Sequence, residues 1–314
     1  MRQIFATGLN RHVSAVGFGC ASLGSRVPAP DGRRALDLAF AEGITWFDVA
    51  PPYGDGRAEA ILGEFLSGKR DQVAICTKVG IEAPHLSLPA RLAKPALRTV
   101  LKLAPHLRKQ IARHRPASSR APLNAAQIEG SVTASLKRLK IDYVDVLALH
   151  DPSEVDVIND EVLAALSRII EKGYARVVGI AGERAVAENG LRSNSLYGMT
   201  QYASEPLTAS SFERPILRVT HSVFGVGGAL SNLTAALADN PVILGKLRDL
   251  GLSGTYNQIA ATALMQLALS SNSQGVVLAS MFRRDHLQFN VAQASGVPNE
   301  HLVALLADFA QQIR

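Results

Sequence analysis

The sequence predicts a (β/α)8 TIM barrel with an N-terminal β-hairpin and a basic insertion after the third barrel strand. Short apolar runs alternate with segments of helical periodicity, which is typical of parallel α/β proteins. Eight such runs follow one another, and polar residues suited to catalysis stand at the ends of several. The chain has 314 residues and is 47% hydrophobic, enough for one large core, so we expect a single barrel domain over residues 1–314.

The apolar runs place the eight barrel strands in order along the chain. We expect them at Val16–Cys20, Thr45–Val49, Ala74–Lys78, Val144–Leu149, Arg176–Ile180, Gly198–Tyr202, Arg218–Ser222 and Gly275–Leu278. Two short segments before them, Gln3–Phe5 and His12–Val13, predict a small hairpin that closes the bottom of the barrel.

Helical periodicity fills the intervals between these strands. We expect helices at Asp31–Glu42, Ala58–Leu66, Ala125–Leu139, Asp160–Lys172, Ala185–Arg192, Ala229–Ala238, Tyr256–Ser270, after Arg284, and at His301–Arg314. Gly43 and Gly173 follow helical runs and suit C-caps, because glycine enters the left-handed region without a Cβ penalty. Asn124 is placed to cap the helix that starts at Ala125.

The net charge of +6 is concentrated in one segment. Residues 83–122 contain nine basic residues and no acidic one, and the rest of the chain carries a net charge of −3. The insertion leaves the barrel after Lys78 and Gly80, so one hypothesis makes it a lid that favours anionic substrates. The alternative is a solvated excursion without a role in catalysis. It lacks aromatic residues for base stacking, and we expect no nucleic-acid partner.

Composition also limits the cellular setting. Both cysteines, Cys20 and Cys76, fall in apolar strands and are interpreted as reduced core residues, which fits a cytoplasmic protein. The first residues contain no apolar signal-peptide core, and the longest apolar stretch, Ile259 to Ser270, is too short to span a bilayer. We therefore expect no membrane partner. No metal site is expected, because the histidines are scattered and no pair has HExxH spacing.

Four polar residues are expected to meet at one rim of the barrel. Asp48, Lys78 and His150 each lie at or just past the C-terminal end of a predicted strand, and Tyr53 follows Asp48 in the next loop. Catalytic groups of such barrels collect at the C-terminal ends of the strands. A phenol, an ammonium, a carboxylate and an imidazole together indicate proton transfer to or from a carbonyl or alcohol oxygen. Taken singly, each also has a structural interpretation: a strand-end cap, a packed loop aromatic, a snorkelling lysine or a core histidine.

Several motifs resemble those of the aldo-keto reductase family. They are Val16-Gly17-Phe18-Gly19, Phe47-Asp48-Val49-Ala50-Pro51-Pro52-Tyr53-Gly54, Glu59-Ala60-Ile61-Leu62-Gly63, Thr77-Lys78-Val79-Gly80, Ser135-Leu136-Lys137-Arg138-Leu139, Asp142-Tyr143-Val144-Asp145 and Leu149-His150-Asp151-Pro152. The match runs in order along nearly the whole chain except the insertion, and it is looser in the second half. The bacterial aldose-dehydrogenase-like branch is closer than the mammalian aldose-reductase branch.

The resemblance implies a nicotinamide dinucleotide bound without a Rossmann domain, whose glycine-rich fingerprint is absent from this sequence. It further implies that Tyr53 is the general acid that protonates the carbonyl oxygen. Lys78 would lower the pKa of Tyr53, because a nearby ammonium favours the phenolate. Asp48 would keep Lys78 charged and aimed, and His150 would hydrogen-bond the substrate oxygen.

The cofactor residues implied by the resemblance fit less closely. After the fifth strand the family usually has Gly-Val-Ser-Asn, whereas this chain has Gly179-Ile180-Ala181-Gly182 and lacks both side chains that hold the nicotinamide carboxamide. Backbone groups, Glu183 or water would have to substitute. His221 takes the position of the tyrosine that usually stacks on the nicotinamide. The implied set is Gly19, Cys20, Ala21, Asp48, Gln201, His221, Ser222, Phe224, Gly225, Ser280, Arg283, Arg284, His286 and Asn290.

The segment from Ser280 to Asn290 resembles the part that holds the adenosine half of the cofactor, and Asn290 aligns with the adenine-binding asparagine. Arg283 and Arg284 near a helix start suit a phosphate. NADP(H) is therefore favoured as the cofactor, and NAD(H) is the alternative. The structural interpretation of Arg283 and Arg284 is that they are solvent-facing arginines at a helix start.

The sequence thus predicts an NAD(P)(H)-dependent oxidoreductase. Its reaction would interconvert a carbonyl (aldehyde, ketone or sugar hemiacetal) with the corresponding alcohol or lactone. The alternative is a catalytically weak cofactor-binding barrel that acts as a redox sensor or regulator, as the potassium-channel β subunits of the family suggest. We expect a small-molecule carbonyl or sugar as partner, and a monomer or weak homo-oligomer.

Overall fold

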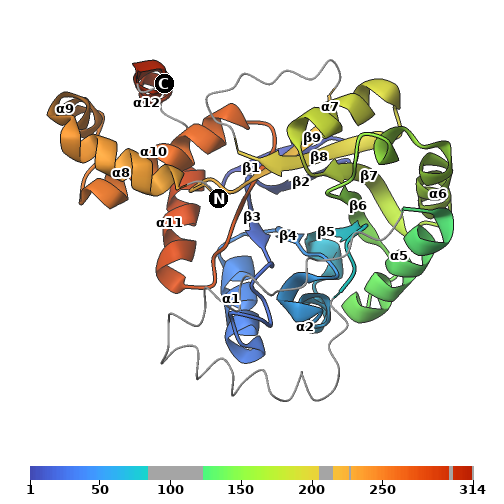
Figure 1. The fold of residues 1–314 in the computed structure, drawn as a ribbon. Coiled ribbons are helices and arrows are strands. Elements are labelled where there is room, and N and C mark those ends of the chain that lie inside the picture. Colours follow the sequence, from blue (N-terminus) through green and yellow to red (C-terminus); the bar gives the residue numbers. More distant parts are fainter. Residues whose placement is uncertain (84–122, 205–214, 226–227, 297–299, 313–314) are drawn as a thin grey trace, which may run out of the picture.

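The computed structural model describes residues 1–83, 123–204, 215–225, 228–296 and 300–312. Eight parallel strands form a closed barrel in the order β10-β3-β4-β5-β6-β7-β8-β9 (Figure 1). The strands are β3 (Val16–Gly19), β4 (Trp46–Asp48), β5 (Ala74–Val79), β6 (Val144–His150), β7 (Ala175–Ala181), β8 (Tyr197–Ala203), β9 (Leu217–His221) and β10 (Val276–Ala279). The predicted (β/α)8 barrel is confirmed, and each predicted strand coincides with an observed one.

The predicted hairpin is also present. Strands β1 (Gln3–Ala6) and β2 (Arg11–Ser14) pair antiparallel. Apolar side chains of the hairpin, among them Ile4, Leu9 and Val13, belong to the same buried cluster as Val146 and Val276 of the barrel interior. The hairpin therefore plugs the end of the barrel where the strands begin.

Helices surround the barrel (Figure 1). They are α1 (Ala29–Ala41), α2 (Ala58–Phe65), α5 (Ala125–Leu139), α6 (Asp160–Glu171), α7 (Arg184–Ser193), α8 (Ala229–Asp239), α9 (Pro241–Asp249), α10 (Tyr256–Ser271), α11 (Arg284–Ser295) and α12 (Glu300–Gln312). Short 3-10 turns are η1 (Tyr53–Asp55), η2 (Arg70–Gln72) and η3 (Asp156–Ile158). Apart from Ala83, the basic insertion lies outside the described residues.

The helix ends follow the predicted capping. The Asn124 side chain accepts a hydrogen bond from the Gln127 backbone N–H at 2.9 Å, and Gly43 and Gly173 have φ angles of 86° and 72°. Helix α9 was not predicted. Its signal in the sequence was Asn240 before Pro241. The asparagine side chain accepts a hydrogen bond from the Ile243 N–H at 3.1 Å. Proline suits the first helical position, because the N–H that it lacks would have no partner within the helix there.

The core has two main layers and a smaller satellite. Strand β5 is buried at every position, because its two faces meet the barrel interior and the surrounding helices, as expected for a parallel sheet. A separate apolar cluster joins α8, α9, α10 and α12 through residues such as Leu237, Leu247, Ile259 and Leu302. This satellite lies at one side of the barrel (Figure 1).

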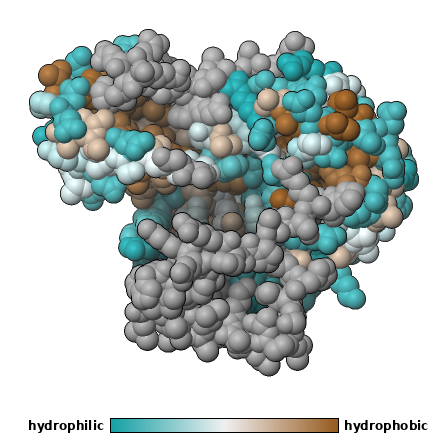
Figure 2. Space-filling model, in the orientation of Figure 1, coloured by the Kyte–Doolittle hydropathy of each residue, from teal (hydrophilic) through white to brown (hydrophobic). Residues whose placement is uncertain are grey.

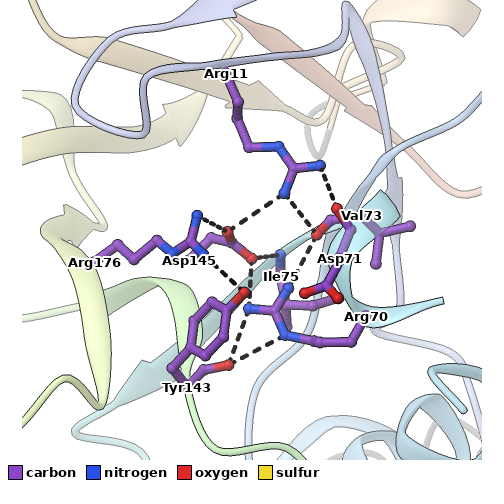
Figure 3. A network of polar contacts seen from close by, with 8 residues as sticks. All are labelled: Arg11, Arg70, Asp71, Val73, Ile75, Tyr143, Asp145 and Arg176. Atoms are coloured by element: carbon purple, nitrogen blue, oxygen red, sulfur yellow. Dashed lines mark hydrogen bonds and ion pairs between the residues drawn. The ribbon is translucent and has the colours of Figure 1, made fainter. Parts of the chain in front are cut away.

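A polar network closes the bottom of β6 (Figure 3). The Asp145 carboxylate is fully buried; its Oδ2 lies 2.8 Å from Arg70 Nη2 and accepts from the Ile75 N–H at 2.8 Å. Arg11 from the hairpin and Arg176 from β7 lie within 3.9 Å of Oδ1. Since these groups come from the hairpin, η2 and two strands, one carboxylate ties four segments together at the end opposite the predicted catalytic rim.

The visible surface carries apolar side chains in separate patches, one of them over the end formed by α8 and α9 (Figure 2). Val242 of α9 is among the most exposed large apolar residues of the described ranges. Within those ranges no helix combines the length and the apolar character that crossing a membrane requires.

Candidate active site

The four predicted catalytic residues meet at the C-terminal end of the barrel. Asp48 is the last residue of β4, Lys78 the penultimate residue of β5 and His150 the last of β6, while Tyr53 starts η1. All four line one cavity of about 1710 Å³. The strand ends thus bring together residues as far apart in the sequence as Asp48 and His150, as the barrel geometry requires.

A tight turn sets the position of Tyr53. Its backbone N–H donates to the Ala50 carbonyl at 3.0 Å, and Gly54 follows with φ of 63°. A Cβ at Gly54 would lie 1.8 Å from the Leu23 carbonyl oxygen, so no other residue fits there. Glycine at this place lets the loop pass close enough to the β3–α1 connection to turn the phenol toward the rim.

The Lys78 ammonium links the carboxylate to the phenol. Lys78 Nζ donates to Asp48 Oδ1 at 2.6 Å, to the Val49 carbonyl at 3.3 Å and to the Tyr53 hydroxyl at 3.5 Å. The side chains of Lys78 and Asp48 are only 2% and 3% exposed. A buried ammonium with three acceptors is fixed in position, which a solvated lysine would not be.

The pKa values of Lys78 and Tyr53 are both raised, for different reasons. Burial alone would lower the pKa of Lys78, but the charges of Asp48 and Tyr53 outweigh it and the pKa is raised, so Lys78 stays charged. For Tyr53, burial raises the pKa, and the opposing charge of Lys78 reduces that rise without reversing it. The predicted lowering by Lys78 is present, but desolvation of the phenolate is the larger effect, so the net pKa of Tyr53 is raised.

His150 is a neutral imidazole facing this pair. Burial and then the charge of Lys78 lower its pKa to about 3. Its ring meets the Tyr53 ring edge-on, with centroids 5.9 Å apart. Nδ1 is buried and has no hydrogen-bond partner among the described residues. An unpaired acceptor costs less than an unpaired N–H, so the hydrogen belongs on Nε2, where it can serve an oxygen in the cavity.

Most of the predicted cofactor residues line the same cavity. Two do not: Cys20 is buried within the core between strands and helices, and Arg284 is exposed at the start of α11. Both cysteines are buried free thiols, as predicted, and burial, followed by the charge of Asp48, raises the pKa of each.

Two buried amides present unpaired oxygens. Gln201 and Asn290 are 4% and 2% exposed, and neither Gln201 Oε1 nor Asn290 Oδ1 has a hydrogen-bond partner in the described part of the chain. Both residues line the cavity. Buried amide oxygens normally have donors, so these two fit a ligand that brings N–H groups to both places, as the two amino-bearing ends of a nicotinamide adenine dinucleotide do.

The backbone near Ala181 and Gly182 offers little in place of the missing side chains. The Gly182 N–H already donates to the Gln201 carbonyl at 2.9 Å, and the Ala181 carbonyl accepts from Asp151. A Cβ at Gly182 would lie 3.2 Å from Asp151 Cα and 3.3 Å from Pro152 Cδ, so the close approach of this loop suits glycine. A carboxamide here would depend mainly on Gln201.

Arg283 has a partner that the sequence analysis overlooked. Its guanidinium binds Asp285 through Nε at 3.0 Å and Nη2 at 2.5 Å, and this contact holds the pKa of Asp285 at about 2. The signal was the spacing Arg-x-Asp at the helix start. A phosphate at Arg283 has to share the guanidinium with a carboxylate.

The cavity wall also contains charged residues outside the predicted site set. They are Arg26, Asp151, Glu183, Arg184 and Glu188. Three lie in the loop and first turns around α7, directly beyond the altered Ala181-Gly182 strand end. Glu183 was expected only as a possible substitute for the missing carboxamide side chains, and Asp151 stands in the motif around His150. No motif marked Arg26, Arg184 and Glu188, since their role depends on which loops the barrel brings to the mouth.

Comparison with known proteins agrees with this geometry. The sequence model of the aldo/keto reductase family matches residues 15–188, which contain all four rim residues. The chain belongs to the aldo/keto reductase family. Among curated relatives, L-galactose dehydrogenase of Arabidopsis thaliana is 30% identical over 190 residues, 58% of this chain and 48% of the relative. D-threo-aldose 1-dehydrogenase of a Pseudomonas species is 30% identical over 176 residues, 54% of this chain and 50% of the relative.

The aligned part thus spans about half the length of these curated relatives. Solved structures extend the likeness in fold. An aldo-keto reductase from Klebsiella pneumoniae in complex with NADPH superposes with a TM-score of 0.66 at 19% identity, covering 97% of this chain and 94% of that one. Another from the same organism, with NADP and acetate, gives 0.69 at 18% identity, covering 98% and 95%.

Proposed function

We propose that this chain is an NAD(P)(H)-dependent oxidoreductase that interconverts a carbonyl with its alcohol, or a sugar hemiacetal with its lactone. The observation that carries the proposal is the Tyr53 hydroxyl at 3.5 Å from the buried Lys78 ammonium, on the wall of a large cavity. A phenol beside a fixed positive charge can give up and regain a proton with less cost than a phenol in an apolar wall.

The cofactor supplies or accepts the hydride when bound. The proposed contacts are Gln201 for the carboxamide, His221 for the nicotinamide ring, Asn290 for the adenine and Arg283 with the α11 N-terminus for a phosphate. Gly19, Ala21, Ser222, Phe224, Gly225, Ser280 and His286 line the remaining wall. NADP(H) is favoured because Arg283 faces the cavity, and the Klebsiella structures named above carry NADPH and NADP. NAD(H) is the alternative.

Each rim residue has a separate task in this proposal. In reduction, Tyr53 donates its proton to the carbonyl oxygen as the carbon gains hydride, and in oxidation the phenolate takes the hydroxyl proton back. Lys78 stabilises the phenolate that forms, and Asp48 holds Lys78 in place. His150, being neutral, donates one hydrogen bond from Nε2 to the same oxygen and polarises it.

The names of the relatives favour a sugar hemiacetal as the substrate class. Both curated relatives described above are named as sugar dehydrogenases. The wall charges at Asp151, Glu183 and Arg184 suit a substrate with several hydroxyl groups, because carboxylates and guanidinium groups are strong partners for them.

A non-catalytic cofactor-binding role is the second candidate. The engaged backbone at Gly182 and the missing side chains at Ala181 and Gly182 favour it, because they weaken the hold on the carboxamide. One curated relative is named as a probable potassium-channel β subunit of Arabidopsis thaliana. Against it stands the buried Asp48–Lys78 pair, whose desolvation has no use in a protein that only binds.

Tyr53→Phe tests the proposal. Turnover of aldehydes, ketones and aldoses should fall by about 10²- to 10⁴-fold, the usual contribution of a general acid, while cofactor binding stays unchanged. Binding can be followed by quenching of Trp46, the only tryptophan, two residues before Asp48. Tyr143→Phe is the matched control, since it removes a hydroxyl at the opposite end of the barrel. Cofactor binding without turnover of any substrate by the unmodified protein would support the regulatory role instead.

A further inference from the structure

His221 brings a second imidazole into the cavity. It ends β9 and is partly buried. Its Nδ1 lies 2.8 Å from Ser222 Oγ, and Ser222 adopts a φ of 60°. A serine in the left-handed region is uncommon, so the chain bends here in the way that places the hydroxyl against the ring. Nε2 has no protein hydrogen-bond partner among the described residues.

The proposed reaction brings the nicotinamide ring close to His221. The reacting carbonyl oxygen must contact Tyr53 and His150, so the carbon that exchanges hydride lies within one bond of that point. The ring that exchanges the hydride must contact that carbon from the open side of the cavity. Gln201 and His221 line the same cavity as Tyr53 and His150, and His221 is near enough to Asp48, Lys78 and His150 for their charges to interact. This step rests on the proposed function.

Charge distinguishes the two states of that ring. Oxidised nicotinamide carries a positive charge and reduced nicotinamide carries none. The tyrosine that the family usually has at the position of His221 cannot become a cation, whereas the imidazole of His221 can. Two like charges close together in a partly buried site repel strongly. We propose that His221 makes this cavity select between the two redox states of the cofactor: protonated His221 rejects the oxidised form, and neutral His221 accepts both.

The surrounding groups set the pH range of this selection. Burial lowers the pKa of His221, the charge of Asp48 opposes it, and the smaller effect of the Lys78 charge lowers it again, leaving the pKa below the ordinary 6.5. His221 is therefore neutral near pH 7.5 and gains a proton on acidification. Lys78 stays charged and His150 stays neutral across this range, as described above. The other ionisable groups of the wall are Arg26, Asp151, Glu183, Arg184, Glu188, Arg283 and His286.

The experiment measures dissociation constants of NADP⁺ and NADPH by calorimetry between pH 8 and pH 5.5. Both carry the same phosphates and adenine, so their ratio isolates the charge of the nicotinamide ring. We expect the ratio of the NADP⁺ constant to the NADPH constant to rise on acidification, by no more than about tenfold at pH 5.5, because one proton binds with a pKa below 6.5. In two buffers of different ionisation enthalpy, NADP⁺ binding near pH 6 should release protons in excess of NADPH binding.

Variants assign the effect to one side chain. In His221→Phe and in His221→Gln the ratio should be independent of pH, whereas His286→Gln, which removes an exposed histidine of the same wall, should keep the rise. A ratio that is flat in the unmodified protein, or that rises equally in the His221 variants, overturns the inference. Absence of binding by both forms at every pH instead contradicts the proposed function itself. The number of protons released on binding is measured on the unmodified protein, so this part of the test holds even if a His221 variant fails to fold.

Discussion

Lys78 and Asp48 form an ion pair of 2.6 Å inside the barrel wall, where both side chains are almost fully excluded from water. The two residues pair across β4 and β5, because Asp48 lies opposite Cys76 and Lys78 follows two positions later on the same face. Taking two charges out of water is costly unless they stay together. The pair is therefore best understood as a means of holding an ammonium next to Tyr53.

Asp48→Asn should destabilise the protein by about 3–5 kcal/mol, since it leaves a buried ammonium without its counter-charge. Denaturant unfolding measures this loss. The double variant Asp48→Asn/Lys78→Met should recover most of the stability, because no lone charge remains, but none of the activity. Equal loss of stability in the single and double variants would show that the pair contributes packing and not charge compensation.

The pH dependence of carbonyl reduction follows from two pKa shifts. Reduction needs Tyr53 protonated and His150 neutral. Since the pKa of Tyr53 is raised above its ordinary value and that of His150 is about 3, the active form persists from acid to alkaline pH. With NADPH saturating, kcat/KM should stay level between about pH 5 and pH 9. An inflection near pH 6.5 that His150→Gln abolishes would contradict a neutral His150.

Asp285→Asn should increase the preference for NADP(H) over NAD(H). In the unmodified protein the Arg283 guanidinium binds the Asp285 carboxylate through two nitrogens. The substitution frees this guanidinium for a phosphate. Because both side chains are exposed, the gain should be modest, about two- to fivefold in the ratio of the two dissociation constants. Arg283→Gln should shift the ratio in the opposite direction. No change in either variant would remove Arg283 from the phosphate site.

Asp145→Asn should lower stability without affecting catalysis. Asp145 is fully buried against Arg70 (Figure 3), so the change leaves that guanidinium unpaired. A loss of roughly 3 kcal/mol is expected, at the low end for a broken buried pair because Arg70 keeps some contact with water. Arg176→Gln, at 3.9 Å and half exposed, should cost about 1 kcal/mol or less. Turnover should match the unmodified protein in both, since the network lies at the opposite end from the rim.

Sequence periodicity located the eight strands, the hairpin and most helices, because a parallel barrel requires strands buried on both faces, and such strands are apolar throughout. It missed α9, where Asn240-Pro241 was the only local mark of a new helix. The four rim residues were predictable as a set, since each ends a strand or follows one and the barrel places all such ends on one rim.

Other properties depended on distances between residues far apart in the chain. The sequence predicted that Lys78 would lower the pKa of Tyr53, but only the packing around the phenol showed that burial raises it more strongly. It showed that Ala181 and Gly182 lack side-chain donors, but only the tertiary structure showed that the Gly182 N–H is already bound to Gln201. The nearness of His221 to Asp48, Lys78 and His150 was decided in the same way. The order of apolar and polar residues fixes which elements form, whereas desolvation and hydrogen-bond partners are set by neighbours that only the folded chain supplies.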